Sequence, residues 1–343
     1  MSSLLKLAKV VVPEMVPLLE KRFEVLRNIH YQGPIGRRSL ATNLGIGERI
    51  VRAEVQLLQQ QGLVDIQSSG VMITPYGASI YQQLEHMIHD IRGMQNLEAK
   101  VKEALDISHA IVIPGDCDQD PLVLRDAAKS AALQLKRSVK DHMTIGVTGG
   151  ATIYQVMMEM SQQKALKNTK VIPARGGIGG SLEMQSNHIA ARLAEKLGGS
   201  YRLLHVPDNI SSNAKESLMK EPEILNLVTD LHALDILLFG IGRADQMARR
   251  RKLPEDEHEE LLNQGAVGEA FGYYFDVRGR IIKDSNTIGI SLDDYQRIPV
   301  AIAVACGSSK AKAIHGLARL RKEIILVIDE GAAREIVNLG ESN

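Results

Sequence analysis

Residues 36–61, GRRSLATNLGIGERIVRAEVQLLQQQ, decide how the first part of this chain folds. The pattern predicts a short helix that ends near Gly45, a tight turn, and a second helix from about Glu48 to Gln61. Residues 63–74 then read as two short strands joined by a turn. Two helices at a tight turn, followed by such a wing, are typical of a winged helix-turn-helix domain that binds DNA.

The second predicted helix separates apolar from polar side chains. The opposite side from its apolar face carries Arg and Gln, which can bond guanine and adenine edges in a major groove. A merely solvated polar face is the alternative, but turn, helix and wing occur together, which favours DNA. The apolar side is formed by Ile50, Val51, Val55, Leu57 and Leu58. We predict that Arg37 and Arg38 contact DNA phosphates. The residues predicted to contact bases are Arg49, Arg52 and Gln56.

Charge is distributed unevenly along the chain. The net charge is zero over all 343 residues, which on its own argues against nucleic acid. Residues 21–52 nevertheless hold seven Lys and Arg against two Glu, a net charge of +5, and we expect this stretch to face phosphates. Glu54 falls on the apolar side of the second helix. We expect it to pair with a nearby Arg, because a lone buried charge is costly.

Composition limits the location and the partners of the protein. Two cysteines, Cys117 and Cys306, lie far apart in the sequence, which favours a reduced, cytoplasmic environment. The apolar stretches are too short to span a bilayer, and the N-terminus lacks a secretory pattern, so no membrane partner is expected. Aromatic residues form only 3% of the chain, which argues against a stacking platform for single strands. Double-stranded DNA is therefore the expected nucleic-acid partner.

The length of the chain favours two domains over a single core. We assign residues 1–92 to the DNA-binding domain, with a linker helix to about residue 105. Residues 106–343 form an effector-binding and oligomerisation domain. Residues 76–105 read as one or two helices interrupted at Gly93. Such a helix either carries a dimer seam or packs against its own domain, and the sequence leaves both open.

Short apolar strands alternate with helices after residue 110. This alternation predicts an α/β fold with a mostly parallel, doubly wound sheet. A hairpin is expected at residues 273–282, turning on Arg278-Gly279. The predicted strands are residues 110–114, 144–147, 170–173, 201–206, 236–239, 302–305 and 324–328.

Four of these strands end in glycine-rich loops. In an open parallel sheet, ligands bind beyond the carboxyl ends of the strands, where N–H groups at a helix start can hold an anion. Glycine also serves tight turns without a ligand, but cationic side chains such as Lys310 favour an anionic one. We expect the hydroxyls of Thr152, Ser308 and Ser309 to meet a bound phosphate. The loops are residues 148–152, 175–180, 240–243 and 306–310.

Neither a cofactor nor a metal ion is expected. None of the loops has Walker A spacing, and residues 146–150 lack the third glycine of a dinucleotide fingerprint, which argues against NAD. Asp116, Asp118 and Asp120 alternate like the ligands of a calcium loop, but the required glycine and glutamate are missing. Asp120 and Pro121 read more simply as the start of a helix.

The two halves together resemble the SorC-type, DeoR-like sugar-responsive transcription regulators over essentially the whole chain. The resemblance implies a repressor of glycolytic genes that is released or weakened by a phosphorylated sugar effector, with fructose 1,6-bisphosphate as the effector and related phosphosugars binding less tightly. It also implies a homodimer that forms a tetramer on DNA, although the residues alone do not decide between dimer and tetramer. The resemblance rests on residues 36–40, Arg49, Arg52 and residues 148–150, 173–177, 240–242, 269–275, 307–310 and 329–333.

The resemblance implies a Rossmann-like, isomerase/deaminase-like domain for the effector and assigns its contacts. Our hypothesis places one phosphate at residues 149–152 with Lys310, and the other near Arg175, Gly177 and Arg250. Ala151 departs from the hydroxyl residue that we would expect beside Thr152, so one phosphate hydrogen bond is lost or passes to water. Side chains that would accept sugar hydroxyls complete the site. The predicted effector-binding residues are Gly149, Gly150, Ala151, Thr152, Arg175, Gly176, Gly177, Gln185, Arg250, Glu269 and Lys310.

Sugar-phosphate isomerases and deaminases have a similar domain, which makes an enzyme the alternative hypothesis. Those enzymes carry a histidine in a Gly-x-Gly-x-Asp-Gly-His-like loop, whereas the comparable residues 240–246 end in Gln246. Glutamine cannot perform general acid-base chemistry near neutral pH. Glu269 is a single carboxylate without a paired acid. We therefore expect binding without turnover, and no catalytic residue is predicted.

Overall fold

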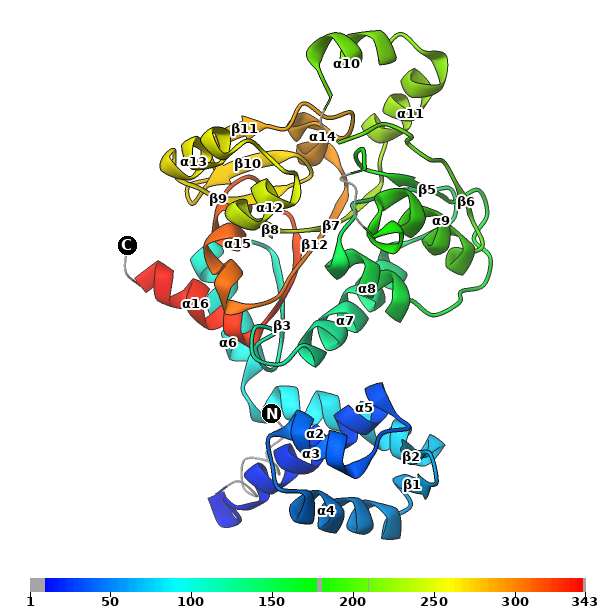
Figure 1. Ribbon diagram of the computed structural model, residues 1–343, viewed down its shortest axis with the longest axis vertical. Helices are drawn as coiled ribbons and strands as arrows, with labels where there is room; N and C mark the ends of the chain where they lie inside the picture. The colour runs from blue at the N-terminus through cyan, green and yellow to red at the C-terminus, as the bar shows by residue number, and fades with distance from the viewer. Residues whose placement is uncertain (1–9, 178–180, 209, 342–343) are drawn as a thin grey trace. The chain divides into compact units, whose positions relative to one another are not determined.

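The computed structural model describes residues 10–177, 181–208 and 210–341. Residues 1–9 of the predicted DNA-binding domain and residues 178–180 of the second glycine-rich loop lie outside this part of the chain. Backbone contacts divide the chain into two compact units, with the division between Gln95 and Asn96. Each unit is described separately (Figure 1).

The N-terminal unit contains the predicted winged helix-turn-helix. Gly45 ends the first helix of the pair in the left-handed region, at φ 63°, where glycine carries no steric penalty. The two wing strands pair antiparallel, with Val64 opposite Ile73. The elements are α2 (Met15–Gln32), α3 (Arg37–Leu44), α4 (Glu48–Gln60), β1 (Val64–Gln67), β2 (Gly70–Ile73) and α5 (Pro75–Ile91).

The core of this unit lies between α2, α4 and α5. Val51, Val55 and Leu58 of α4 are fully buried or nearly so, as predicted. Ile50 is not: 45% of it is exposed, so its assignment to the apolar face was wrong. The buried face of α4 is centred on Glu54, Val55 and Leu58. Ile50 lies in the first turn of α4, next to the buried Val51.

The helical stretch after the wing is divided as the sequence predicted. Gly93 adopts φ +70° between the end of α5 and the start of α6 (Met94–Leu105). Within the C-terminal unit, the Glu98 carboxylate of α6 accepts a hydrogen bond of 3.0 Å from the backbone N–H of Val112. That amide belongs to β3 (His109–Ile113), an edge strand of the main sheet. This part of α6 therefore packs against its own unit.

The C-terminal unit is built on a seven-stranded parallel sheet with the order β3-β13-β12-β7-β4-β5-β6. The doubly wound fold predicted from the sequence is confirmed. Helices α7 (Leu122–Ser138), α8 (Ala151–Glu159) and α9 (Ser186–Leu197) contribute to one large apolar cluster with these strands. The other strands of the sheet are β4 (Thr144–Val147), β5 (Lys170–Pro173), β6 (Ser200–Tyr201), β7 (Ile236–Gly240), β12 (Val300–Ala305) and β13 (Ile325–Asp329).

One expectation for the strands needs correction, and one is confirmed. β6 is only two residues long, instead of residues 201–206, because the Asn187 side chain bonds both backbone groups of Leu204, at 2.9 and 3.0 Å, in place of a neighbouring strand. The hairpin predicted at residues 273–282 exists but belongs to a four-stranded antiparallel sheet. That sheet comprises β8 (Gly242–Arg243), β9 (Ala266–Ala270), β10 (Tyr273–Asp276) and β11 (Ile281–Asp284).

The remaining helices connect and cover these sheets (Figure 1). Over the described part of the chain, no helix combines the length and apolarity that a membrane crossing needs. These helices are η1 (Leu182–Met184), α10 (Ser212–Leu218), α11 (Pro222–His232), α12 (Ala244–Arg250), α13 (Glu255–Asn263), α14 (Leu292–Arg297), η2 (Ser308–Lys310), α15 (Ala311–Ala318) and α16 (Glu330–Glu341).

Candidate functional site

A pocket opens where the strand order of the main sheet reverses. The chain runs outward from β4 through β5 to β6 and then returns to β7, which lies on the other side of β4. Such a switch point separates the loops that follow the two central strands and leaves a crevice between them. Thr148 spans it: its N–H donates to Leu238 O at 3.1 Å, and its Oγ1 accepts from Gly240 N at 3.3 Å.

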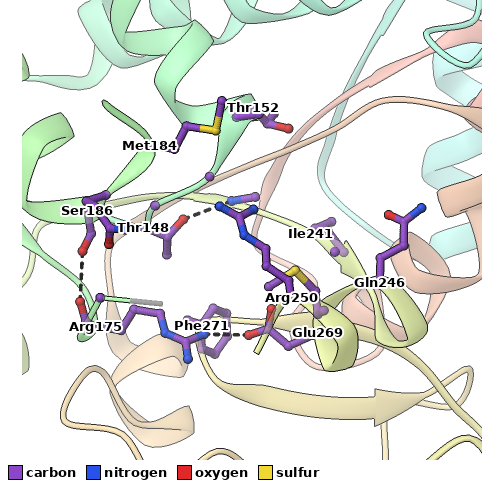
Figure 2. Close-up of a pocket in the computed structure, with 18 of the residues that line it drawn as sticks. Thr148, Thr152, Arg175, Met184, Ser186, Ile241, Gln246, Arg250, Glu269 and Phe271 are labelled. Carbon is purple, nitrogen blue, oxygen red and sulfur yellow. Dashed lines mark hydrogen bonds and ion pairs between the residues drawn. The ribbon is translucent and has the colours of Figure 1, made fainter. Parts of the chain in front are cut away.

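The pocket encloses about 270 Å³ and collects every residue predicted to bind the effector. Figure 2 shows Arg250 in the middle, with Arg175 and Glu269 along one side and Thr152 and Met184 along the other. Segments far apart in the sequence meet here. The lining consists of residues 148–152, 175–177, 184–186, 240–242, Gln246, Met247, Arg250, Glu269, Phe271 and Lys310.

The N-terminus of α8 faces this pocket without a side-chain cap. Gly149 must be glycine there, because a Cβ would lie 2.8 Å from the carbonyl oxygen of Met184. Gly150 adopts φ +112°, which side chains rarely tolerate, and its N–H donates to the same oxygen at 2.8 Å. A helix start carries a partial positive charge and free N–H groups. It is therefore suited to an anion.

Two cations lie in the pocket without a carboxylate partner. Among the described residues, neither Arg250 nor Lys310 forms an ion pair. Arg250 Nη1 lies 4.0 Å from the position that a Cβ on Gly150 would occupy. We expected Arg250 beside Arg175 and Gly177, but the structure places its guanidinium next to the helix N-terminus. Unpaired positive charge from Arg250 therefore lies at the start of α8, and Lys310 adds a second unpaired cation to the same pocket.

Arg175 and Glu269 belong to a buried network of four charges. Arg175 Nη1 donates to Glu269 Oε1 at 2.7 Å, and its Nε donates to Asp208 at 2.8 Å. Arg251 lies 2.8 Å from each carboxylate, and its Nη1 donates to Tyr274 Oη at 2.7 Å. Burial alone would raise the pKa of Glu269, but Arg251 and Arg175 hold it below its ordinary value. The four charges cancel, so the network adds no net charge to the pocket.

The sequence did not single out Asp208, Arg251 or Phe271. Arg251 follows Arg250 in a run of basic residues, and nothing in the sequence distinguishes which side of the helix end each takes. Phe271 lies at φ +36°, an uncommon conformation for a non-glycine residue, in the turn between β9 and β10. The Glu269 carboxylate holds that turn by accepting a hydrogen bond of 2.7 Å from Gly272 N.

The expected phosphate contacts of Ser308 and Ser309 are not supported. Neither residue lines the pocket; only Lys310 of this loop does. The Asp118 carboxylate instead accepts Ser309 N at 2.9 Å and Ser308 Oγ at 3.3 Å. An internal carboxylate thus satisfies the donors that we assigned to a ligand. Asp118 and its neighbours therefore hold the loop in place, and over the described residues no group of three or more potential metal ligands was found.

The polar side of α4 is exposed, as the sequence predicted. Arg49, Arg52 and Gln56 are exposed, and Arg38 of α3 is exposed within 3.9 Å of Glu48. Arg37 is half-buried. These positions leave the predicted DNA residues accessible, and their contacts with DNA stay a prediction.

Part of the basic stretch 21–52, which we expected to face phosphates, pairs with carboxylates of its own unit. Arg27 is 2% exposed and pairs with Glu24, while Lys21 and Arg22 donate to Glu54 at 2.8 and 3.1 Å. The expected partner for Glu54 is therefore confirmed. Burial would raise the pKa of Glu54, but the hydrogen bonds from these two cations lower it. Arg27 is therefore buried away from any phosphate, whereas Lys21 and Arg22 pair with Glu54 and stay about a third exposed.

Two family models together match nearly the whole chain beyond its first residues. Residues 18–88 match the CggR N-terminal DNA-binding domain, and residues 89–338 match a sugar-binding domain. The chain is 40% identical over 338 residues to the central glycolytic genes regulator of Priestia megaterium, covering 98% of this chain and 99% of that protein. It is 39% identical over 337 residues to the Bacillus subtilis protein of the same name, with the same coverage.

Solved structures of similar proteins agree with these sequence matches. A SorC family transcriptional regulator from Enterococcus faecalis is 36% identical, with a TM-score of 0.66 over 71% of this chain and 99% of that one. The full-length sorbitol operon regulator SorC from Klebsiella pneumoniae shares the fold, with a TM-score of 0.68 over 94% of this chain and 98% of that one, at 18% identity. All four proteins are transcription regulators. None is an isomerase or a deaminase.

Proposed function

Since this chain belongs to the SorC/DeoR family of DNA-binding, sugar-responsive transcription regulators, we propose that it represses glycolytic genes and that a phosphorylated sugar weakens its hold on operator DNA. Fructose 1,6-bisphosphate is the proposed effector. Residues 1–92 would bind DNA, with the linker helix reaching about residue 105, and residues 106–343 would bind the effector and assemble the oligomer. The names of the two glycolytic relatives support the choice of target genes.

The observation that carries the proposal is the convergence of Arg250, Lys310 and the uncapped start of α8 on one pocket. Two unpaired cations and a helix N-terminus can balance the charge of a ligand with more than one phosphate group. A neutral sugar would leave them without a counter-charge. One phosphate would lie against residues 149–152 and Arg250. The other would use Lys310 or the spare N–H groups of Arg175.

The sugar itself would meet the polar groups of the same pocket. Arg175 Nη1 and Gly272 N donate hydrogen bonds to Glu269 Oε1, and Arg251 Nη2 forms an ion pair with the same oxygen at 2.8 Å, which leaves Oε2 for a sugar hydroxyl. Gln185 lies over Gly177, where a Cβ would come within 2.9 Å of the Gln185 Oε1. Its amide is proposed to bond a second hydroxyl. Gln246, which also lines the pocket, supplies no general acid or base for turnover.

A thermal-shift panel of phosphosugars tests the effector. A ligand at 100 times its Kd stabilises the folded protein by about 2.7 kcal/mol, and fructose 1,6-bisphosphate should give the largest shift. Arg250→Ala and Lys310→Ala should each remove most of it. Lys322→Ala, on a cation that pairs with Asp106 outside the pocket, is the matched control and should keep it. A larger shift with an unphosphorylated sugar or a nucleotide would contradict the assignment.

Effector binding can change repression only if the ligand prefers one arrangement of the protein over another. One winged helix covers a single half-site, so we propose at least a homodimer, and a tetramer on operator DNA. In this scheme the ligand alters cooperative operator occupancy without touching DNA. Arg52, Arg49 and Gln56 would read bases, and Arg37 and Arg38 would contact phosphates.

A further inference from the structure

Asp208 joins the pocket through two arginines, although it does not itself line the cavity. It is 4% exposed, and a buried carboxylate requires cationic or hydrogen-bonding partners. One oxygen accepts from both Nε and Nη2 of Arg175, and the other accepts from Arg251 Nε at 2.8 Å. Asp208 thus binds one edge of the Arg175 guanidinium with one oxygen and Arg251 with the other.

The backbone of Asp208 is fixed to the loop that carries Arg175. Asp208 N donates to Gly177 O at 2.9 Å, and Gly177 N donates to Val206 O at 3.1 Å. Gly176 permits this approach, because a Cβ there would lie 2.7 Å from Val206 O and 2.9 Å from Pro207 O. The carboxylate and the arginine are therefore carried by two paired segments, whose backbones cannot separate without breaking that pairing.

The hydrogen bonds to Asp208 and Glu269 leave part of the Arg175 guanidinium available to a ligand. A guanidinium carries five N–H donors in a rigid plane. Two of them are used by Asp208 and one by Glu269, so one N–H on each terminal nitrogen remains. Held from two sides, the plane cannot rotate, and the direction of the two remaining donors is set before a ligand arrives. Preorganised donors bind more tightly than mobile ones because little side-chain entropy is lost.

We infer that Asp208 is a positioning residue of the effector site, which orients the Arg175 guanidinium toward a ligand phosphate and balances its charge. The inference rests on the proposed function. In this scheme Arg250 and Lys310 contribute the net positive charge of the pocket, and Arg175 contributes N–H donors in a fixed orientation. Loss of Asp208 frees the plane of Arg175 and leaves two buried arginines to share Glu269 alone.

Calorimetric titration with fructose 1,6-bisphosphate tests this on the full chain. Asp208→Asn keeps the shape of the side chain and should weaken binding about tenfold, as loss of a residue that orients a direct ligand contact generally does. Asp230→Asn is the matched control, since Asp230 also bridges two cations, Lys170 at 2.9 Å and Arg202 at 3.1 Å, but away from the pocket lining. It should bind as the wild type does.

A double-variant cycle separates positioning from a general loss of structure. Arg175→Lys keeps the charge and loses the fork, so Asp208→Asn should weaken binding no further in that background. Full additivity would overturn the inference, as would wild-type affinity in Asp208→Asn. If that variant does not fold, Asp208→Glu is the second test, because it keeps the charge but displaces the carboxylate by one methylene. It should bind fructose 1,6-bisphosphate at least about fivefold more weakly than the wild type. Wild-type affinity in Asp208→Glu would equally overturn the inference. A wild-type protein that binds no phosphosugar would overturn the proposed function and this inference together.

Discussion

Replacing Glu54 by Gln should reduce the stability of α4 by an amount that can be estimated from the structure. The Glu54 carboxylate is 11% exposed and links α4 to α2 through Lys21 and Arg22, whose side chains are 37% and 31% exposed. Breaking a fully buried pair costs about 3–5 kcal/mol, and an exposed pair contributes at most about 1 kcal/mol. Because both cations keep a third of their surface in water, we expect a loss of about 1–2 kcal/mol.

Hydrogen–deuterium exchange measured by mass spectrometry reads this loss locally. Peptides from α4 and α2 in the Glu54→Gln protein should exchange about 5–30 times faster than in the wild type, while peptides from the parallel sheet should not change. Glu195→Gln is the matched control, because Glu195 pairs with Arg192 on the surface at 2.6 Å, with both side chains more than half exposed. Exchange in α9 should then change by less than about threefold.

The pH dependence gives a second check on the same variant. The folded protein lowers the pKa of Glu54 from its ordinary 4.5. The carboxylate is therefore ionised and stabilising above that value, and its contribution is lost as the pH falls through the lower, folded pKa. The difference between wild type and Glu54→Gln should be full at pH 7 and narrow below pH 4.5. Equal exchange at pH 7, or a difference that persists in acid, would refute the reasoning.

Three further predictions concern the sites. Gly149→Ala should abolish the thermal shift by fructose 1,6-bisphosphate, because its Cβ would collide with Met184 O at 2.8 Å and displace the start of α8; an undiminished shift would show that this loop does not hold a phosphate. Arg52→Ala should cost about 1–3 kcal/mol on operator DNA and relax discrimination at one base pair, whereas Arg38→Ala should weaken all duplexes alike and flatten the salt dependence in anisotropy titrations. Equal affinity of the intact protein for operator and scrambled duplexes would end the repressor interpretation. Analytical ultracentrifugation should find at least a dimer on operator DNA, and a strict monomer there would rule out the proposed assembly.

Local sequence patterns predicted the framework well. Turn glycines such as Gly45 and Gly93 fall where the helices end, because only a left-handed residue lets the chain turn there at low cost. The alternation of apolar runs with helices predicted six of the seven strands of the main sheet within two residues, whereas β6 is much shorter than residues 201–206. Four strands ending in glycine-rich loops located the pocket. These features depend on residues close together in the chain.

The errors came from features that depend on distant residues. Ile50 has the helical spacing of a buried residue, but no distant segment covers it and it is 45% exposed. The carboxylate that satisfies Ser309 comes from Asp118, 191 residues earlier in the chain. Likewise the role of Asp208 depends on its distance from two arginines on other segments. Periodicity carries no information about such pairings, and they decide which polar groups remain for a ligand.

The measurement that bears most directly on the central claim is operator release. Full-length protein would select its preferred duplex from a randomised pool, and anisotropy would follow binding of that duplex as fructose 1,6-bisphosphate is added. Operator affinity should fall for the wild type. Arg250→Ala should bind the duplex equally well without effector and should not respond to it. Unchanged operator affinity at saturating effector, or the same response to an unphosphorylated sugar, would contradict the account.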